Sequence, residues 1–135
     1  MIKKLSHVGI AVRDLKSSIA LFSKLFGVSD VPTENVADQH VNVGFIRTGN
    51  ASVELTEATS PESPIAKFIG NRGEGVHHLS FEVDDIRGEI KRLSAEGFQM
   101  IDKEPRVGAG GYWIAFIHPK STNGVLVEIS QKIPE

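Results

Sequence analysis

The sequence contains an internal repeat with an offset of 71 residues. Residues 7–27 read HVGIAVRDLKSSIALFSKLFG, and residues 78–97 read HLSFEVDDIRGEIKRLSAEG, so that His7 aligns with His78. The two segments share a pattern of apolar positions and few identities. A repeated supersecondary unit cannot bury its apolar face alone, so the repeat predicts two copies of one unit. A chain of 135 residues is large enough for one ordinary domain and too small for two independent cores.

Each copy begins with a strand-like segment that leads into a helix-like segment. Apolar residues alternate over 7–12 and over 78–83, which is typical of a strand. The apolar residues that follow recur at the spacing of one helix face. The expected helix ends are N-caps at Asp14 and at Asp84 or Asp85, and C-terminal glycines at Gly27 and Gly97.

The rest of each copy is typical of strands separated by turns. Strands are predicted over 41–46, 51–56, 112–117 and 125–130, and a short helix over 63–70. The expected fold class is α+β, with two tandem βαβββ modules in one domain spanning 1–135. Module one is expected at about 3–57, a linker helix at about 61–72 and module two at about 75–131.

Four side chains occupy corresponding positions in the two copies. The last predicted strand reads Val-Glu-Leu around Glu54 and Val-Glu-Ile around Glu128, so each glutamate faces away from its apolar neighbours. His7 and His78 likewise lie on the less apolar face of strands whose other face is expected to be core. If the copies pack with pseudo-twofold symmetry, the four side chains converge.

Two imidazoles and two carboxylates form a nitrogen and oxygen ligand set for a divalent metal ion. Such a set suits cobalt, manganese, nickel, zinc or iron and leaves positions open for substrate. A single histidine or glutamate in a strand is usually structural or exposed, but two histidines and two glutamates in repeat-related positions favour a metal site. His77 is excluded by alternation, because it lies on the side of Leu79 and Phe81. The absence of cysteine excludes thiolate sites and disulfides.

Composition argues against several kinds of partner. The net charge is −2 and no basic stripe dominates, which disfavours nucleic acid. No apolar run reaches the roughly 18 residues of a membrane helix, so no membrane partner is expected. The N-terminal segment has no long apolar signal core, and a cytoplasmic location is expected.

Several longer segments resemble one enzyme family. They are SPIAKF at 63–68, GEGVHH at 73–78, FEVDDI at 81–86, DKEPR with GAGG within 102–111, and HPKS with GVLVE within 118–128. These segments resemble the vicinal oxygen chelate (glyoxalase/bleomycin resistance) superfamily and, within it, the methylmalonyl-CoA epimerase family. The resemblance covers almost the whole chain.

The resemblance implies a half-open barrel, a homodimer and one divalent metal ion per chain, with cobalt expected. It places the metal ligands at His7, Glu54, His78 and Glu128. The implied reaction interconverts (2R)- and (2S)-methylmalonyl-CoA, so an acyl-CoA substrate is expected. The α-proton is removed, and the metal stabilises the resulting enolate.

Substrate contacts are expected in two glycine- and lysine-containing loops. Backbone amides at Gly110 and Gly111 could approach a carboxylate or phosphate, although an ordinary flexible turn fits equally well. Lys120 and Ser121 belong to the segment that resembles the family's HPKS motif, which implies a place near the substrate carboxylate. Without the resemblance, a plain turn before the last strand is favoured.

Two positions depart from the family's pattern. Glu54 is a glutamine in some members, and Val43 stands where some members have a further catalytic glutamate. Epimerisation needs proton removal on one face and return on the other, most simply by two bases. We therefore expect Glu54 and Glu128 to act as bases as well as ligands.

Two other functions use the same scaffold. A glyoxalase I-type lactoylglutathione lyase would use the same ligands, but the epimerase-like segments of the second half disfavour it. A non-catalytic, metal-free binding module of the same fold would not need all four ligands. Fold alone does not separate these functions, because one scaffold hosts several chemistries.

Overall fold

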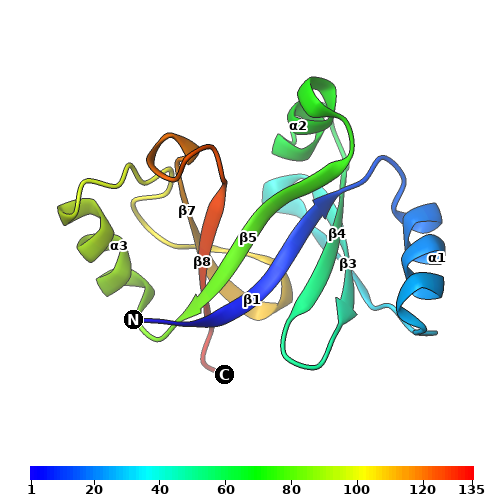
Figure 1. The fold of residues 1–135 in the computed structure, drawn as a ribbon, viewed down its shortest axis with the longest axis horizontal. Coiled ribbons are helices and arrows are strands. Elements are labelled where there is room, and N and C mark those ends of the chain that lie inside the picture. The colour runs from blue at the N-terminus through cyan, green and yellow to red at the C-terminus, as the bar shows by residue number, and fades with distance from the viewer. The chain divides into compact units, whose positions relative to one another are not determined.

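The computed structural model describes residues 1–135, which form two compact units. Unit 1 consists of Met1–His7 and His78–Glu135, and unit 2 consists of Val8–His77. Strands β1 (Ile2–Ala11) and β5 (Gly75–Val83) each have residues in both units. The order of elements is β-α-β-β-β, a linker helix, then β-α-β-β-β, which confirms the predicted α+β class with two tandem modules (Figure 1).

Unit 2 is a small sheet with a helix packed against it. Its elements are α1 (Leu15–Phe26), β2 (Thr33–Val36), β3 (Val41–Arg47), β4 (Ser52–Ala58) and α2 (Pro64–Arg72). The strand order is β2-β3-β4-β1, with antiparallel pairing of β3 to both neighbours. The helix α1 and the sheet enclose a core whose buried members are Val12, Leu15, Ile46 and Leu55.

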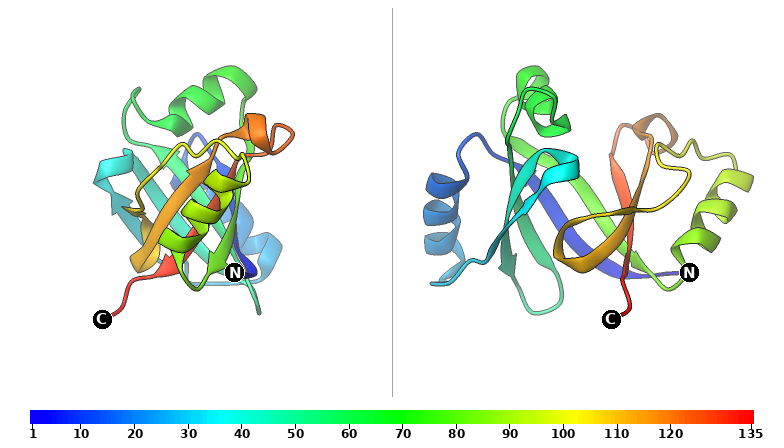
Figure 2. Two further views of the ribbon diagram at one scale, coloured as in Figure 1. Left: turned by 90° about the vertical axis from the view of Figure 1, so that its left-hand side faces the viewer. Right: turned by 180° about the vertical axis from the view of Figure 1, so that it is seen from behind.

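Unit 1 repeats this plan. Its further elements are α3 (Ile86–Ala95), β6 (Arg106–Val107), β7 (Tyr112–Ile117) and β8 (Val127–Lys132). The strand order is β1-β5-β8-β7-β6, so that β6-β7-β8-β5 take the places of β2-β3-β4-β1, and β5 and β8 are parallel. The helix α3 lies against β7 and β8 (Figure 2). The core between them comprises Val83, Ile86, Ile90, Leu93, Met100, Ala115, Ile117 and Ile129.

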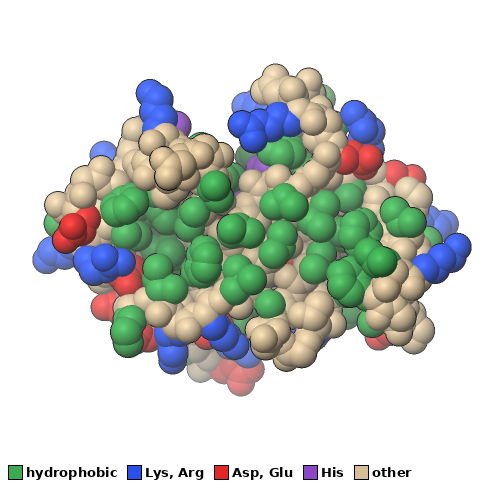
Figure 3. Space-filling view, in the orientation of Figure 1, with side chains coloured by type: hydrophobic (Ala, Val, Ile, Leu, Met, Phe, Trp, Pro, Cys, Tyr) green, Lys and Arg blue, Asp and Glu red, His purple; other side chains and the backbone are tan.

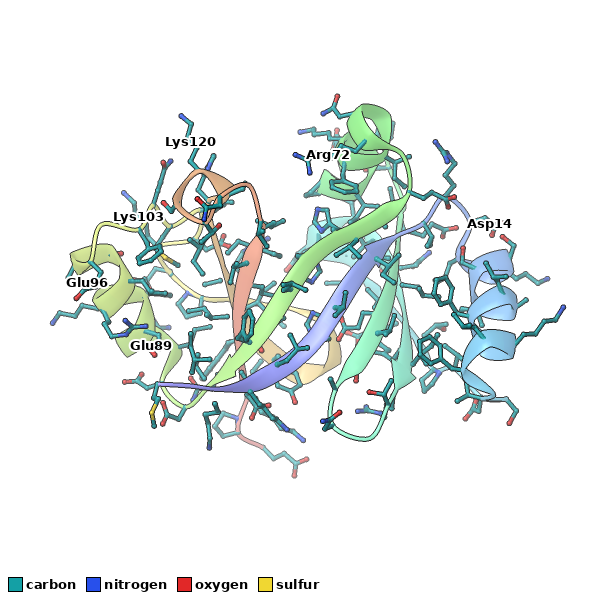
Figure 4. The ribbon with its side chains drawn as sticks, in the orientation of Figure 1. Asp14, Arg72, Glu89, Glu96, Lys103 and Lys120 are labelled. Carbon is teal, nitrogen blue, oxygen red and sulfur yellow. The ribbon has the colours of Figure 1, made fainter.

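The ends of α1 and α3 follow the predicted capping signals. The carboxylate of Asp14 accepts hydrogen bonds from N–H groups of the first turn of α1 (Figure 4). Asp85 does the same for α3, which settles the choice between it and its neighbour. Gly27 ends α1 with a φ of 70°, and Gly97 follows the end of α3 with a φ of 95°. These left-handed conformations favour glycine. None of the helices is long and apolar enough to cross a bilayer.

A side chain from the last strand of each module also fixes the start of the module's helix. The Leu15 N–H donates to Glu57 Oε2 at 2.8 Å, and the Ile86 N–H donates to Gln131 Oε1 at 2.8 Å. Each acceptor lies three residues after a glutamate predicted as a metal ligand. The repeat therefore links each helix to the strand that carries the candidate ligand.

Gln131→Ala is expected to lower the free energy of unfolding by about 1 kcal/mol, because the Ile86 N–H loses its acceptor. Urea denaturation measures this change. Lys132→Ala is the matched control, since Lys132 is exposed at the end of the same strand. Equal stability of the two variants would show that the hydrogen bond contributes nothing.

The two faces of β5 differ from the prediction in their burial. Alternation is confirmed, because His78 and Ser80 lie on one face and Leu79 and Phe81 on the other. The face that carries the histidine is the more buried, whereas Leu79 and Phe81 remain half-buried. The expectation that the apolar face of this strand is core is therefore confirmed for Val83, which is 2% exposed, and wrong for Leu79 and Phe81. On the polar face the Phe116 ring packs against His78.

Candidate metal centre

Three of the four predicted ligands come together in unit 1. His7 lies on β1, His78 on β5 and Glu128 on β8, and these strands are consecutive in the sheet. These three residues are 8%, 7% and 3% exposed. Since imidazole and carboxylate groups are rarely buried without a partner, the cluster needs a chemical explanation.

The donor atoms of the cluster lie within 4.8 Å of one another. His7 Nε2 and His78 Nε2 are 3.1 Å apart, and their rings meet edge to face. Glu128 Oε2 lies 3.3 Å from His7 Nε2, and Oε1 lies 3.9 Å from His78 Nε2. The two nitrogens and the carboxylate therefore face one common point.

Neighbouring side chains hold the two rings in place. Ser6 Oγ lies 3.2 Å from His7 Nδ1, which leaves the Nε2 of this ring facing the cluster. The Phe116 ring packs edge to face on His78, with a centroid separation of 5.5 Å. A partner on the second ring nitrogen is a usual companion of a metal-ligating histidine, because it fixes the tautomer and the ring orientation.

Burial sets the protonation of the cluster. It lowers the pKa of His7 from 6.5 to about 4, so the ring is neutral at neutral pH. Burial also raises the pKa of Glu128 from 4.5 to about 7, and a hydrogen bond with Ser80 opposes this rise only in part. A buried carboxyl that ionises near neutral pH is a group that a nearby cation would stabilise.

These residues fit a divalent metal ion. Glu128 Oε2 is buried and makes no hydrogen bond of its own. Two ligand atoms about 2.1 Å from one ion and at right angles lie about 3 Å apart, close to the separation of the two Nε2 atoms. Neutral imidazoles and a carboxylate are a donor set for cobalt, zinc, manganese, nickel or iron. The cluster can therefore hold one divalent ion.

The fourth predicted ligand belongs to unit 2. Glu54 lies on β4, half-buried and opposite Phe45 in the register with β3, and its place in the ligand set stays a prediction. Val43, on β3, is 2% exposed and packs as a core residue. His77 contacts the Phe68 ring at 4.9 Å, consistent with its exclusion from the ligand set.

The predicted substrate residues Lys120 and Ser121 form a short 3-10 turn, η3 (Pro119–Ser121). His118 Nδ1 accepts a hydrogen bond from the Lys120 N–H at 3.0 Å, and Ser121 Oγ accepts one from the Gln99 N–H at 2.9 Å. The Lys120 side chain is exposed and extends from the turn (Figure 4). The turn is thus ordered by its own side chains, and the ammonium group is accessible to an anion.

Backbone geometry explains much of the glycine-rich segment. Gly110 and Gly111 have φ values of 73° and 78°, which residues other than glycine rarely adopt. A Cβ on Gly108 would lie 2.8 Å from Ile114 Cγ2, so a side chain does not fit there. A substrate contact by the amides of Gly110 and Gly111 stays a prediction beside this structural role.

Three residues that support the cluster were not predicted from the sequence. Ser80 lies two positions after His78 and shares its face, so strand alternation could have identified it. Ser6 directly precedes His7, but no pattern marks it. Phe116 reaches the cluster because β7 pairs with β8 opposite Glu128, a register that a single sequence does not reveal.

Comparison with known proteins identifies the family of the chain. The profile of the Glyoxalase/Bleomycin resistance protein/Dioxygenase superfamily matches residues 6–116. The chain is 40% identical to a mitochondrial methylmalonyl-CoA epimerase of Dictyostelium discoideum, covering 97% of this chain and 80% of the relative. It is 38% identical to an ethylmalonyl-CoA/methylmalonyl-CoA epimerase of Cereibacter sphaeroides, and the match covers 97% of this chain and 99% of the relative.

A solved structure shows the same fold with a ligand. It is a variant of Streptomyces coelicolor methylmalonyl-CoA epimerase in complex with 2-nitronate-propionyl-CoA, which matches with a TM-score of 0.92 and 30% identity. The match covers 98% of this chain and 96% of that one. The chain belongs to the Glyoxalase/Bleomycin resistance protein/Dioxygenase superfamily and, within it, to the methylmalonyl-CoA epimerase family.

Proposed function

We propose that this chain is a metal-dependent epimerase that interconverts (2R)- and (2S)-methylmalonyl-CoA. The buried cluster of His7, His78 and Glu128 carries the proposal. Relatives that are 38–40% identical and named as epimerases of this substrate support it. The epimerase-like segments of the second half, together with these relatives, disfavour a lactoylglutathione lyase.

The metal, when bound by these ligands, would supply positive charge that stabilises negative charge developing on the thioester during proton removal. Cobalt is our proposed ion, with Glu54 as the fourth ligand. The protein's own contribution is to hold the substrate and to move the proton. Lys120 presents an accessible ammonium group for the substrate carboxylate, and Ser121 and the amides of Gly110 and Gly111 are proposed as further contacts.

Glu128 is proposed as one of the two bases. Burial raises the pKa of its carboxyl to about 7 in the metal-free protein. With an ion bound this pKa would fall again, so the carboxylate would be ionised and able to accept the α-proton at neutral pH. Glu54 occupies the equivalent strand position in the other module. We propose that it serves the opposite face of the substrate carbon.

We further propose that the chain works as a homodimer in the cytoplasm. Apolar side chains reach the surface on the viewed face of each unit (Figure 3). In unit 1, Ile2 and Leu5 are 46% and 36% exposed, and Leu79 and Phe81 are half-buried. A second copy covering these residues would remove that apolar area from water. Light scattering measures the mass in solution.

The decisive experiment is metal-dependent exchange of the α-proton. The protein is stripped of metal, reloaded with cobalt and incubated with methylmalonyl-CoA in deuterated water, and proton NMR follows the α-proton signal. We expect exchange far above the metal-free and protein-free controls. A parallel assay with a glutathione hemithioacetal tests the lyase.

The outcomes separate the three functions. Bound cobalt without exchange, but with turnover of the hemithioacetal, would replace the proposal with a glyoxalase-type lyase. Neither bound metal nor exchange would replace it with a non-catalytic binding module.

A further inference from the structure

Two buried serines lie beside the candidate metal ligand Glu128. Ser80, on β5, is directly opposite Glu128 in the parallel pairing of β5 with β8. Ser130 follows Glu128 by two positions on β8 and shares its face. The serines are 0% and 1% exposed. Buried hydroxyl groups without solvent need partners inside the protein, so their contacts identify their role.

The hydroxyl groups form a chain that ends on the carboxylate. Ser80 Oγ lies 3.2 Å from Ser130 Oγ, and Ser80 also makes a hydrogen bond with Glu128. Ser130 Oγ lies 3.5 Å from the carbonyl oxygen of Phe81. Glu128 Oε2 has no hydrogen bond and lies 3.3 Å from His7 Nε2. Ser80 therefore contacts the carboxyl group while Oε2 faces the histidines.

The other module has the same hydroxyl-to-carbonyl contact without a second hydroxyl. Thr56, the repeat equivalent of Ser130, donates from Oγ1 to the carbonyl oxygen of Ile10 at 3.1 Å. Gly9 stands at the repeat position of Ser80, so that module has no hydroxyl beside Thr56 at this position. The hydroxyl-to-carbonyl link is therefore common to both modules, and the second hydroxyl belongs to unit 1 alone. In unit 1 the same link is longer, at 3.5 Å, and Ser130 has Ser80 as its closer partner.

We infer that Ser80 and Ser130 form a hydroxyl pair that positions Glu128 for metal ligation. The inference rests on the proposed metal-dependent function. An ionised carboxylate only accepts hydrogen bonds, and a serine hydroxyl has one proton to donate. In this structure Ser80 donates to Ser130, and Ser130 donates to the Phe81 carbonyl. When Glu128 is ionised beside a bound ion, the hydroxyl of Ser80 would turn its one proton to the carboxylate. This arrangement restricts rotation of the carboxyl group and leaves Oε2 for the ion, as hydrogen-bonded partners of ligating carboxylates do.

The test compares cobalt binding by Ser80→Ala and Ser130→Ala with that of the wild-type protein. A competing chelator gives the dissociation constant, and the visible absorption of bound cobalt reports the ligand geometry. We expect Ser80→Ala to weaken cobalt binding about 10-fold or more and to shift the cobalt bands. Ser130→Ala should have a smaller effect that disappears in the Ser80→Ala background, because Ser130 acts through Ser80.

Ser63→Ala is the matched control. Ser63 is also a buried serine, 0% exposed, but its hydroxyl caps α2 in unit 2. It should lower thermal stability without changing cobalt affinity or the cobalt spectrum. A Ser80→Ala protein with the wild-type dissociation constant and spectrum would overturn the inference while leaving the proposed function intact. Absence of cobalt binding by the wild-type protein would instead overturn both.

Discussion

Glu128→Gln is expected to reduce cobalt-dependent exchange of the α-proton of methylmalonyl-CoA by about 10³-fold, within the range for loss of a general base. Glutamine has nearly the same shape as glutamate, so the buried position should still be filled. It has no negative charge to hold the ion and no basic oxygen to accept the proton. The exchange rate is measured by proton NMR in deuterated water at saturating substrate.

The effect of losing the base on the exchange rate can be separated from the effect of losing the ion. The cobalt dissociation constant of Glu128→Gln is measured first, and exchange is then followed at a cobalt concentration that saturates the variant. If the exchange rate remains low when the variant is saturated with cobalt, the loss is in proton transfer. Glu82→Gln is the matched control, since Glu82 is a half-buried carboxylate of the same unit that lies 3.8 Å from Lys4 and should exchange at the wild-type rate.

Glu54→Gln completes the test of the two-base hypothesis. We expect it also to slow exchange, because the repeat places Glu54 and Glu128 in equivalent strand positions. Wild-type exchange by both variants would exclude these carboxylates as the bases. In that case another acid or base would have to serve the site.

The repeat made the secondary structure accessible to prediction. Helices α1 and α3 have clear capping residues and helical spacing, and both were located to within a few residues. The strands β2 and β6 were not located, because each is short and contributes almost nothing to the core. The parallel pairing of β5 with β8 was not predicted either, since strand partners depend on contacts between residues far apart in sequence.

The candidate site was predictable only at the level of its ligands. His7, His78 and Glu128 stand out for two reasons. The repeat relates the two histidines to each other, and strand alternation places all three residues on the less apolar face of their strands. Their supporting contacts depend on register: Phe116 and Ser80 both lie opposite Glu128 on neighbouring strands. Strand alternation also misjudged the burial of Leu79 and Phe81, because alternation shows which residues share a face and not which face is covered.

The free energy of unfolding of the metal-free protein is expected to rise up to about pH 7 and then to stay nearly level. Burial lowers the pKa values of His7 and His77 from 6.5 to about 4, so the unfolded chain binds more protons in this window and these groups make stability rise with pH. Burial raises the pKa of Glu128 from 4.5 to about 7, so the folded protein retains a proton that the unfolded chain loses, and this group makes stability fall with rising pH. Below about pH 7 the two histidines outweigh the carboxyl, and above it the opposing contributions nearly cancel.

Removing one contribution at a time provides a specific assay for the buried carboxyl. Between pH 6.5 and 8 the carboxyl should lower the free energy of unfolding by about 1 kcal/mol and the two histidines should raise it by about as much, as the linkage relation gives for folded pKa values of about 7 and about 4. Urea denaturation at each pH measures this free energy. Glu128→Gln should therefore turn the level profile into a rise of about 1 kcal/mol, and saturating cobalt should produce a rise in the wild-type protein, because the ion favours the ionised carboxylate. His77→Phe should instead produce a fall about half as large, because one of the two opposing histidines is removed. A level profile in Glu128→Gln would assign the titration to another group, and a rising profile in the metal-free wild-type protein would mean that the carboxyl is already ionised without metal.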